Sequence, residues 1–167
     1  MQFFCYHRDR TGSTPLRADL VEEHWSYMDR FELIARGPTF LDEDTLTGSV
    51  HVVEVPDVAA ARAFVFDEPS YQAGAYRDVL LRRTAWQVLD MSVTGGCLAI
   101  GFLDRPAPYD DLPAPPRDLA GFGPLLSDDG AMLLGAAALG ATEEAARGAL
   151  VGCAVAETHR WERGGRR

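Results

Sequence analysis

The strongest indication of the fold comes from residues 37–55, GPTFLDEDTLTGSVHVVEV. Phe40 and Leu41 predict a short strand, and the acidic residues 42–44 that follow them predict a turn. Residues 47–55 are rich in β-branched side chains and end at Pro56, which is typical of a second strand. The stretch therefore predicts a β-hairpin.

The segments around this hairpin supply the other elements of one folding unit. Alternating aromatic and polar residues predict a strand over residues 2–8, and apolar residues at spacings of three and four predict one long helix over residues 16–34. Asp57 is a good N-cap for an Ala-rich helix over residues 58–66, and residues 75–83 return as a strand. This order of elements, βαββαβ, predicts the ferredoxin-like arrangement of a sheet with two helices on one face.

A shortened copy of the same pattern follows. The motif GPTFLD at residues 37–42 returns as GPLLSD at residues 123–128. The copy carries a strand over residues 97–105, a hairpin strand over residues 132–139 and a helix that opens at Thr142.

The first helix of the copy is the part that departs from the pattern. It shrinks to residues 108–119, where four prolines leave little helix. We therefore expect an α+β protein with a first unit over residues 1–86, a linker over residues 87–96 and a shortened second unit over residues 97–167, whose sheet covers the open face of the first.

Composition excludes several classes of function. The chain has 167 residues and a formal net charge of −9, which disfavours nucleic acid and anionic membranes as partners. All 16 basic residues are Arg, so Schiff-base lysines and Walker-type phosphate loops are excluded. The sequence has no export leader and no spanning segment, and its three cysteines suit reduced core thiols, so we expect a soluble cytoplasmic protein. The Arg- and Ala-rich composition, without Lys or Asn, favours a high-GC bacterial source.

Five short motifs, in this order and spacing, resemble the YCII-related (YciI-like) family. They are Glu22-Glu23-His24, Arg36-Gly37-Pro38, Asp42-Glu43-Asp44, Gly48-Ser49 and Asp67-Glu68-Pro69-Ser70-Tyr71-Gln72-Ala73-Gly74. The resemblance covers residues 1–86 well and residues 97–163 weakly. It implies ferredoxin-like units in a dimeric-α+β-barrel-type arrangement, which a tandem copy would build within one chain. One branch of the family removes chloride from a chlorinated hydroxyhydroquinone.

The resemblance also implies an active pair, a helix His with a nearby Asp. His24 matches the His, and Asp29 is the closest match for the Asp. Helix phase turns His24 toward the sheet, which fits either a buried structural imidazole or a functional one. Asp29 lies about 140° around an ideal helix from His24, so carboxylates of neighbouring loops are alternative partners: Asp42, Asp44 and Asp67.

Other candidate side chains lie on strands or loops. His7 and His51 share the parity of apolar neighbours, which leaves open whether they face the helices or the opposite side of the sheet. Tyr6, His51 and Tyr71 are candidate substrate-binding residues, Tyr76 is a further source of hydrogen bonds, and His159 is expected at the surface. No zinc-type cluster, dinucleotide motif or nucleophile elbow is present, so we predict no metal and no cofactor.

The leading hypothesis is a cofactor-independent enzyme of catabolism or secondary metabolism. His24 would act as general acid/base in an elimination, isomerisation, decarboxylation or cyclisation of an aromatic or enolisable small molecule. The alternatives are a non-catalytic small-molecule-binding or interaction protein and a cofactor-free oxygenase. The chain is expected to act as a monomer or homodimer.

Overall fold

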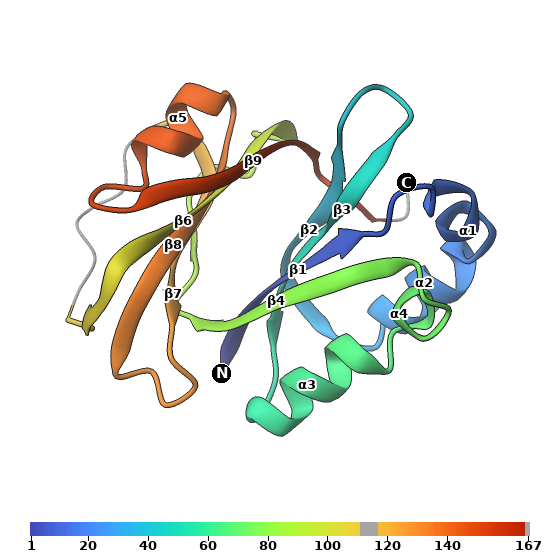
Figure 1. Cartoon of the computed structure of the whole chain (residues 1–167), viewed down its shortest axis with the longest axis horizontal. Coiled ribbons are helices and arrows are strands. Elements are labelled where there is room, and N and C mark those ends of the chain that lie inside the picture. Colours follow the sequence, from blue (N-terminus) through green and yellow to red (C-terminus); the bar gives the residue numbers. More distant parts are fainter. Residues whose placement is uncertain (111–116, 166–167) are drawn as a thin grey trace. The chain divides into compact units, whose positions relative to one another are not determined.

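The computed structural model describes residues 1–110 and 117–165 (Figure 1). The chain forms two compact units. Unit 1 comprises Met1–Leu81 together with the C-terminal residues from Arg163, and unit 2 comprises Arg82–Glu162. None of the described helices is long and apolar enough to span a membrane.

Unit 1 has the ferredoxin-like order that the sequence predicts. Its strands follow the order β4-β1-β3-β2, and β3 pairs antiparallel with both β1 and β2. The elements are β1 (Gln2–Asp9), α1 (Thr14–Asp19), α2 (Val21–Met28), β2 (Glu32–Phe40), β3 (Leu46–Glu54), α3 (Val58–Phe66), α4 (Pro69–Gln72) and β4 (Tyr76–Thr84).

The helices of unit 1 cover one face of its sheet, where alternating residues such as Phe3 and Cys5 of β1 and Val53 of β3 are apolar. Phe3 and Cys5 of β1 pack with Met28 of α2 and Phe64 of α3 in one buried cluster. The predicted cap is confirmed, since the Asp57 side chain accepts a hydrogen bond from the Ala60 backbone N–H at 2.8 Å. The sheet and α3 are thus fixed by patterns that are visible in the sequence.

The long helix predicted over residues 16–34 is wrong in its second half. The helical region breaks at Leu20 and ends at Met28, and β2 begins at Glu32. The nine-residue β3 requires a partner of similar length, and pairing of Glu32 with Glu54 and of Leu33 with Val53 satisfies backbone groups that a longer helix would leave unpaired. The apolar spacing of Phe31 and Ile34 therefore belongs to the start of a strand.

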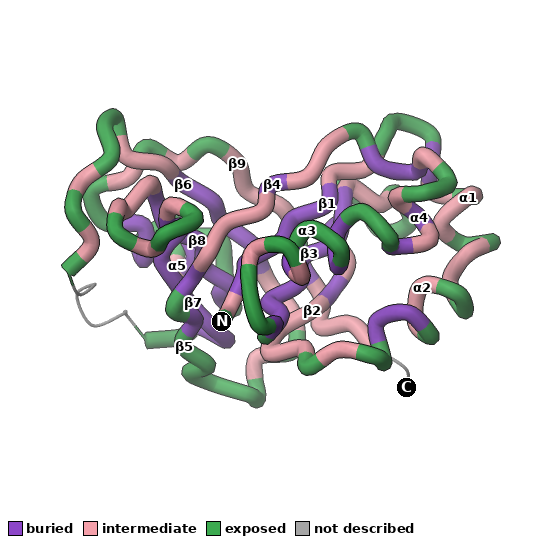
Figure 2. Tube along the Cα trace, turned by 90° about the horizontal axis from the view of Figure 1, so that it is seen from below, coloured by how far each residue is buried: buried purple, intermediate pink, exposed green. Residues whose placement is uncertain are grey.

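Unit 2 repeats the strand order of unit 1. Its strands follow the order β9-β6-β8-β7, with the two-residue β5 added beside β7. The elements are β5 (Gln87–Val88), β6 (Gly95–Pro108), β7 (Leu119–Leu126), β8 (Met132–Gly140), α5 (Glu143–Gly148) and β9 (Ala154–Glu162). Figure 2 shows that buried residues are frequent in β1 and β3 of unit 1 and in β7 and β8 of unit 2.

The predicted shortening of the first helix in unit 2 falls mainly on residues 111–116, which lie outside the described residues. The predicted strands and the helix after Thr142 are confirmed, and the Thr142 side chain caps α5 by accepting from the Ala145 backbone N–H. The α+β class with ferredoxin-like units is therefore confirmed.

Candidate functional site

The centre of the candidate site is a short contact between His24 of α2 and Glu68. The imidazole Nδ1 lies 2.7 Å from Glu68 Oε1, although the two residues are 44 positions apart in the sequence. The Glu68 side chain is fully buried, whereas that of His24 is 14% exposed. The pair therefore consists of a buried carboxylate and a partly solvent-exposed imidazole.

Glu68 is held in place by its role as N-cap of α4. Its Oε2 accepts a hydrogen bond from the Tyr71 backbone N–H at 2.7 Å, and Pro69 occupies the first helical turn. Burial by itself would raise the pKa of this carboxyl, but the hydrogen bond and charge of His24 more than offset it, so the pKa lies below the usual value. An ionised carboxylate only accepts, so Nδ1 carries the proton toward Glu68 and Nε2 is left for another partner.

Two further histidines extend the site along the sheet beneath the helices. The ring centroids of His24 and His51 are 5.7 Å apart, and those of His51 and His7 are 5.6 Å apart. Tyr76 of β4 follows, with its ring 4.7 Å from that of His7. The question that sequence parity left open is settled here, because His7 and His51 lie on the helix-facing side of the sheet.

Burial sets the protonation of these two histidines. It lowers the pKa of His7 to about 4 and places that of His51 well below the ordinary value. Both imidazoles are therefore neutral near pH 7, and His24 is the member of the row that is paired with a carboxylate.

A buried ion pair closes the far end of the row. The Arg17 guanidinium donates to Asp9 Oδ1 at 2.9 Å, to Ser49 Oγ at 2.6 Å and to the Gly48 carbonyl at 3.2 Å. The same cation lies 5.4 Å from the centre of the Tyr76 ring. We call His24, Glu68, His51, His7, Tyr76, Arg17 and Asp9 the helix-face cluster.

Glu68 was not among the carboxylates that the sequence offered as partners of His24. Asp29 instead lies at the C-cap of α2, 3.9 Å from the Arg36 guanidinium. Asp42 caps its own turn by accepting from Asp44 and Thr45, and Asp67 is the C-cap of α3. A carboxylate directly before a proline is a recognisable N-cap signal, and the segment Asp67-Glu68-Pro69 carried it.

The candidate substrate-binding residues do not lie together. His51 belongs to the helix-face cluster, but Tyr6 alternates onto the other side of β1, where its buried hydroxyl hydrogen-bonds Thr39 Oγ1 at 3.0 Å. Tyr71 packs its ring edge-on against the exposed Phe66 at 5.1 Å. Tyr76, considered only as a secondary source of hydrogen bonds, lies inside the cluster.

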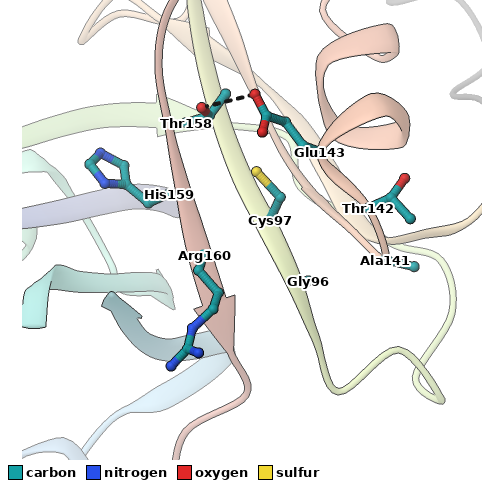
Figure 3. Close-up of a pocket in the computed structure, with 8 residues that line it drawn as sticks. All are labelled: Gly96, Cys97, Ala141, Thr142, Glu143, Thr158, His159 and Arg160. Atoms are coloured by element: carbon teal, nitrogen blue, oxygen red, sulfur yellow. Dashed lines mark hydrogen bonds between the residues drawn. The ribbon is translucent and has the colours of Figure 1, made fainter. Parts of the chain in front are cut away.

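A hollow of about 290 Å³ in unit 2 is separate from these residues (Figure 3). Cys97 of β6, Glu143 of α5 and Thr158 of β9 line it, and Thr158 Oγ1 donates to Glu143 Oε1 at 3.3 Å. His159, on the same rim, is half-buried and contacts Glu157 at 2.9 Å through Nε2. This hollow lacks a buried acid–base pair of the His24–Glu68 kind.

Comparison with solved structures identifies similar chains, two of which are described here. One is 5-chloro-2-hydroxyhydroquinone dehydrochlorinase from Burkholderia phenoliruptrix AC1100, in complex with 2,5-dihydroxybenzoquinone, at 28% identity and a TM-score of 0.47 over 50% of this chain and 92% of that chain. The other is an anthrone oxidase-like protein at 9% identity and a TM-score of 0.50, over 98% of this chain and 90% of that chain, a likeness of fold. No curated protein matches at the same level of significance.

The family comparison covers the unit that carries the helix-face cluster. Residues 1–85, just over half of the chain, match the model of the YCII-related domain. The resemblance first drawn from the motifs around His24 and Glu68 is thereby confirmed, and the chain belongs to the YCII-related family.

Proposed function

We propose that this protein is an enzyme that moves protons on an aromatic or enolisable small molecule, with His24 as general acid/base. The observation that carries the proposal is the 2.7 Å contact between the partly exposed His24 and the fully buried Glu68. A carboxylate in this position fixes the imidazole tautomer and stabilises the imidazolium that forms when the base takes a proton.

The chemistry follows from the free nitrogen of the imidazole. Nε2 takes a proton from a carbon or hydroxyl of the substrate, and the electron pair of the broken bond passes into an adjacent carbonyl or ring to form an enolate. The enolate then collapses by expelling a leaving group, or by taking the proton back at another atom. Elimination, isomerisation and cyclisation pass through such a step, whereas in a decarboxylation the breaking C–C bond supplies the electron pair of the enolate, CO₂ leaves and the imidazolium then protonates the enolate.

The test is carbon-bound hydrogen exchange in D₂O, followed by ¹H NMR with a panel of phenols, hydroxyquinones, lactones and small keto acids. We expect the wild type to exchange or convert at least one class, and the His24→Asn variant to be slower by about 100-fold or more. His159→Asn is the matched control, since it removes another half-buried histidine that contacts a carboxylate, and it should retain the wild-type rate within twofold.

A second variant separates positioning from folding. Glu68→Gln keeps the size of the side chain but not its charge, so kcat should fall by about 10–100-fold with little change in KM. If both variants melted lower but left every rate unchanged, the pair would be structural and the assignment of His24 as general acid/base would be wrong.

A further inference from the structure

Three members of the helix-face cluster keep hydrogen-bonding capacity that the fold does not use. Among the described residues, neither ring nitrogen of His7, nor Nδ1 of His51, nor the Tyr76 hydroxyl forms a hydrogen bond of normal geometry, although Val65 and Ser70 approach His7 and Tyr76. His7 is fully buried, His51 is 2% exposed and Tyr76 is 8% exposed. Buried polar atoms are nearly always paired in folded proteins, so three such side chains in mutual ring contact are unusual.

The fold itself does not require these side chains. The strand registers allow each strand residue of unit 1 to be matched with one of unit 2. Gly37 pairs with Val50 in unit 1, and Gly123 pairs with Ala137 in unit 2. By the same register, His51 corresponds to Ala138 and His7 to Gly101. Unit 2 therefore builds the same strand order with small apolar residues at both positions.

The neighbouring charges fix the hydrogen-bonding role of Tyr76. The guanidinium of Arg17 donates to Asp9, Ser49 and the Gly48 carbonyl, and its charge lies 5.4 Å from the centre of the Tyr76 ring. Burial raises the pKa of Tyr76, which keeps the hydroxyl protonated and able to donate. A neutral imidazole such as that of His7 offers one donor and one acceptor.

We infer that His7, His51 and Tyr76 form the recognition subsite for a neutral hydroxylated aromatic substrate, with Tyr76 donating to the ring oxygen that becomes negative when His24 takes the proton. This inference rests on the proposed function. A neutral substrate fits because Asp9, Arg17 and Glu68 together already carry a net negative charge. His24, whose side chain is 14% exposed, is the side of the subsite that meets solvent.

The test measures, by calorimetry, the binding of hydroquinone and of p-xylene, which keeps the ring but has no oxygen that could accept a hydrogen bond. Hydroquinone should bind the wild type, and the Tyr76→Phe variant should bind it about tenfold more weakly or worse, with the His51→Leu variant affected to the same order. p-Xylene should bind Tyr76→Phe and His51→Leu as it binds the wild type. The matched control is Tyr6→Phe, which removes a hydroxyl from the opposite face of the same sheet and should leave hydroquinone binding unchanged.

The melting temperature, Tm, distinguishes a recognition role of the Tyr76 hydroxyl from a structural role. Loss of an unbonded buried hydroxyl should leave the Tm of Tyr76→Phe unchanged or raise it. A lower Tm with unchanged hydroquinone affinity would overturn the inference, and so would failure of hydroquinone to bind the wild type. Deuterium exchange that is lost in His24→Asn but normal in Tyr76→Phe would also overturn the subsite while leaving the proposed function intact.

Discussion

Unit 1 and unit 2 have the same strand register. The helix-facing side of the strands is polar at two buried positions in unit 1 and apolar at the matching positions in unit 2. In unit 1 this surface carries the imidazoles of His7 and His51, and in unit 2 the same positions are Gly101 and Ala138. Within the described part of the chain, the core cluster of unit 2 on this side contains no histidine, and its residues, Phe122 among them, pack with Ala146, Ala149 and Leu150 of α5 and the turn after it.

The space that His7 fills in unit 1 is closed in unit 2. A Cβ atom built on Gly101 would lie 3.0 Å from the Ala154 carbonyl oxygen and 3.2 Å from Leu150 Cδ1. The strand order does not depend on polar residues here, and buried unpaired polar atoms cost about 1–3 kcal/mol each. We infer that the polar cluster lowers the stability of unit 1, as the residues of functional sites commonly do.

The largest effect is expected when the histidine of unit 1, His51, is placed at the matching position of unit 2, Ala138. Ala138→His should lower the free energy of unfolding by about 3–5 kcal/mol, because the fully buried site has neither volume nor a partner for an imidazole. Replacing His51 of unit 1 by the apolar Leu should cost less than about 1 kcal/mol. Urea denaturation measures both, and equal losses in the two variants would show that the units do not differ as described.

The pH dependence of the free energy of unfolding also distinguishes the units, because the buried His7 and His51 belong to unit 1. The pKa of His7 falls from 6.5 in the unfolded chain to about 4 in the folded one, so its contribution is intact above pH 6.5 and is lost as the pH falls toward 4. The buried His51 acts in the same direction. The lowered pKa of Glu68 adds its loss only below its unfolded value of 4.5.

Between pH 7 and pH 4.5, His7 should therefore lower the free energy of unfolding by about 2–3 kcal/mol. His7→Phe should remove a difference of that size, as measured by urea denaturation at the two pH values. Tyr6→Phe is the control, because it removes no group that titrates in this range. An identical pH dependence in His7→Phe and wild type would contradict the neutral, buried state of His7.

The smallest expected effect concerns the other face of the unit 1 sheet. Tyr6→Phe removes the buried hydrogen bond to Thr39 and should cost about 1 kcal/mol of stability. Turnover of any substrate found should stay within twofold of wild type, because the hydroxyl lies on the face away from His24. A large loss of rate would restore Tyr6 to the substrate-binding role that the sequence suggested.

Local patterns of sequence determined most of the fold. The strand at residues 2–8, the Asp57-capped helix and the hairpin around residues 42–44 each depend on contacts between near neighbours, and all are confirmed. The repeat of the Gly-Pro motif at Gly123 likewise predicted the second unit, because the same hairpin pattern produces the same strand order. His24 could be placed on the inner side of its helix from spacing alone.

Tertiary structure decided what local patterns leave open. The end of α2 at Met28 depends on β2 pairing with β3, and the partner of His24 is a carboxylate 44 residues away whose position depends on the fold of α4 against α2. Parity shows that His7 and His51 share a side with apolar neighbours, but only the packed helices determine which side that is. The sequence by itself determined the elements and the inward histidine, whereas the assembled site depends on side chains that long-range strand pairing and helix packing bring together.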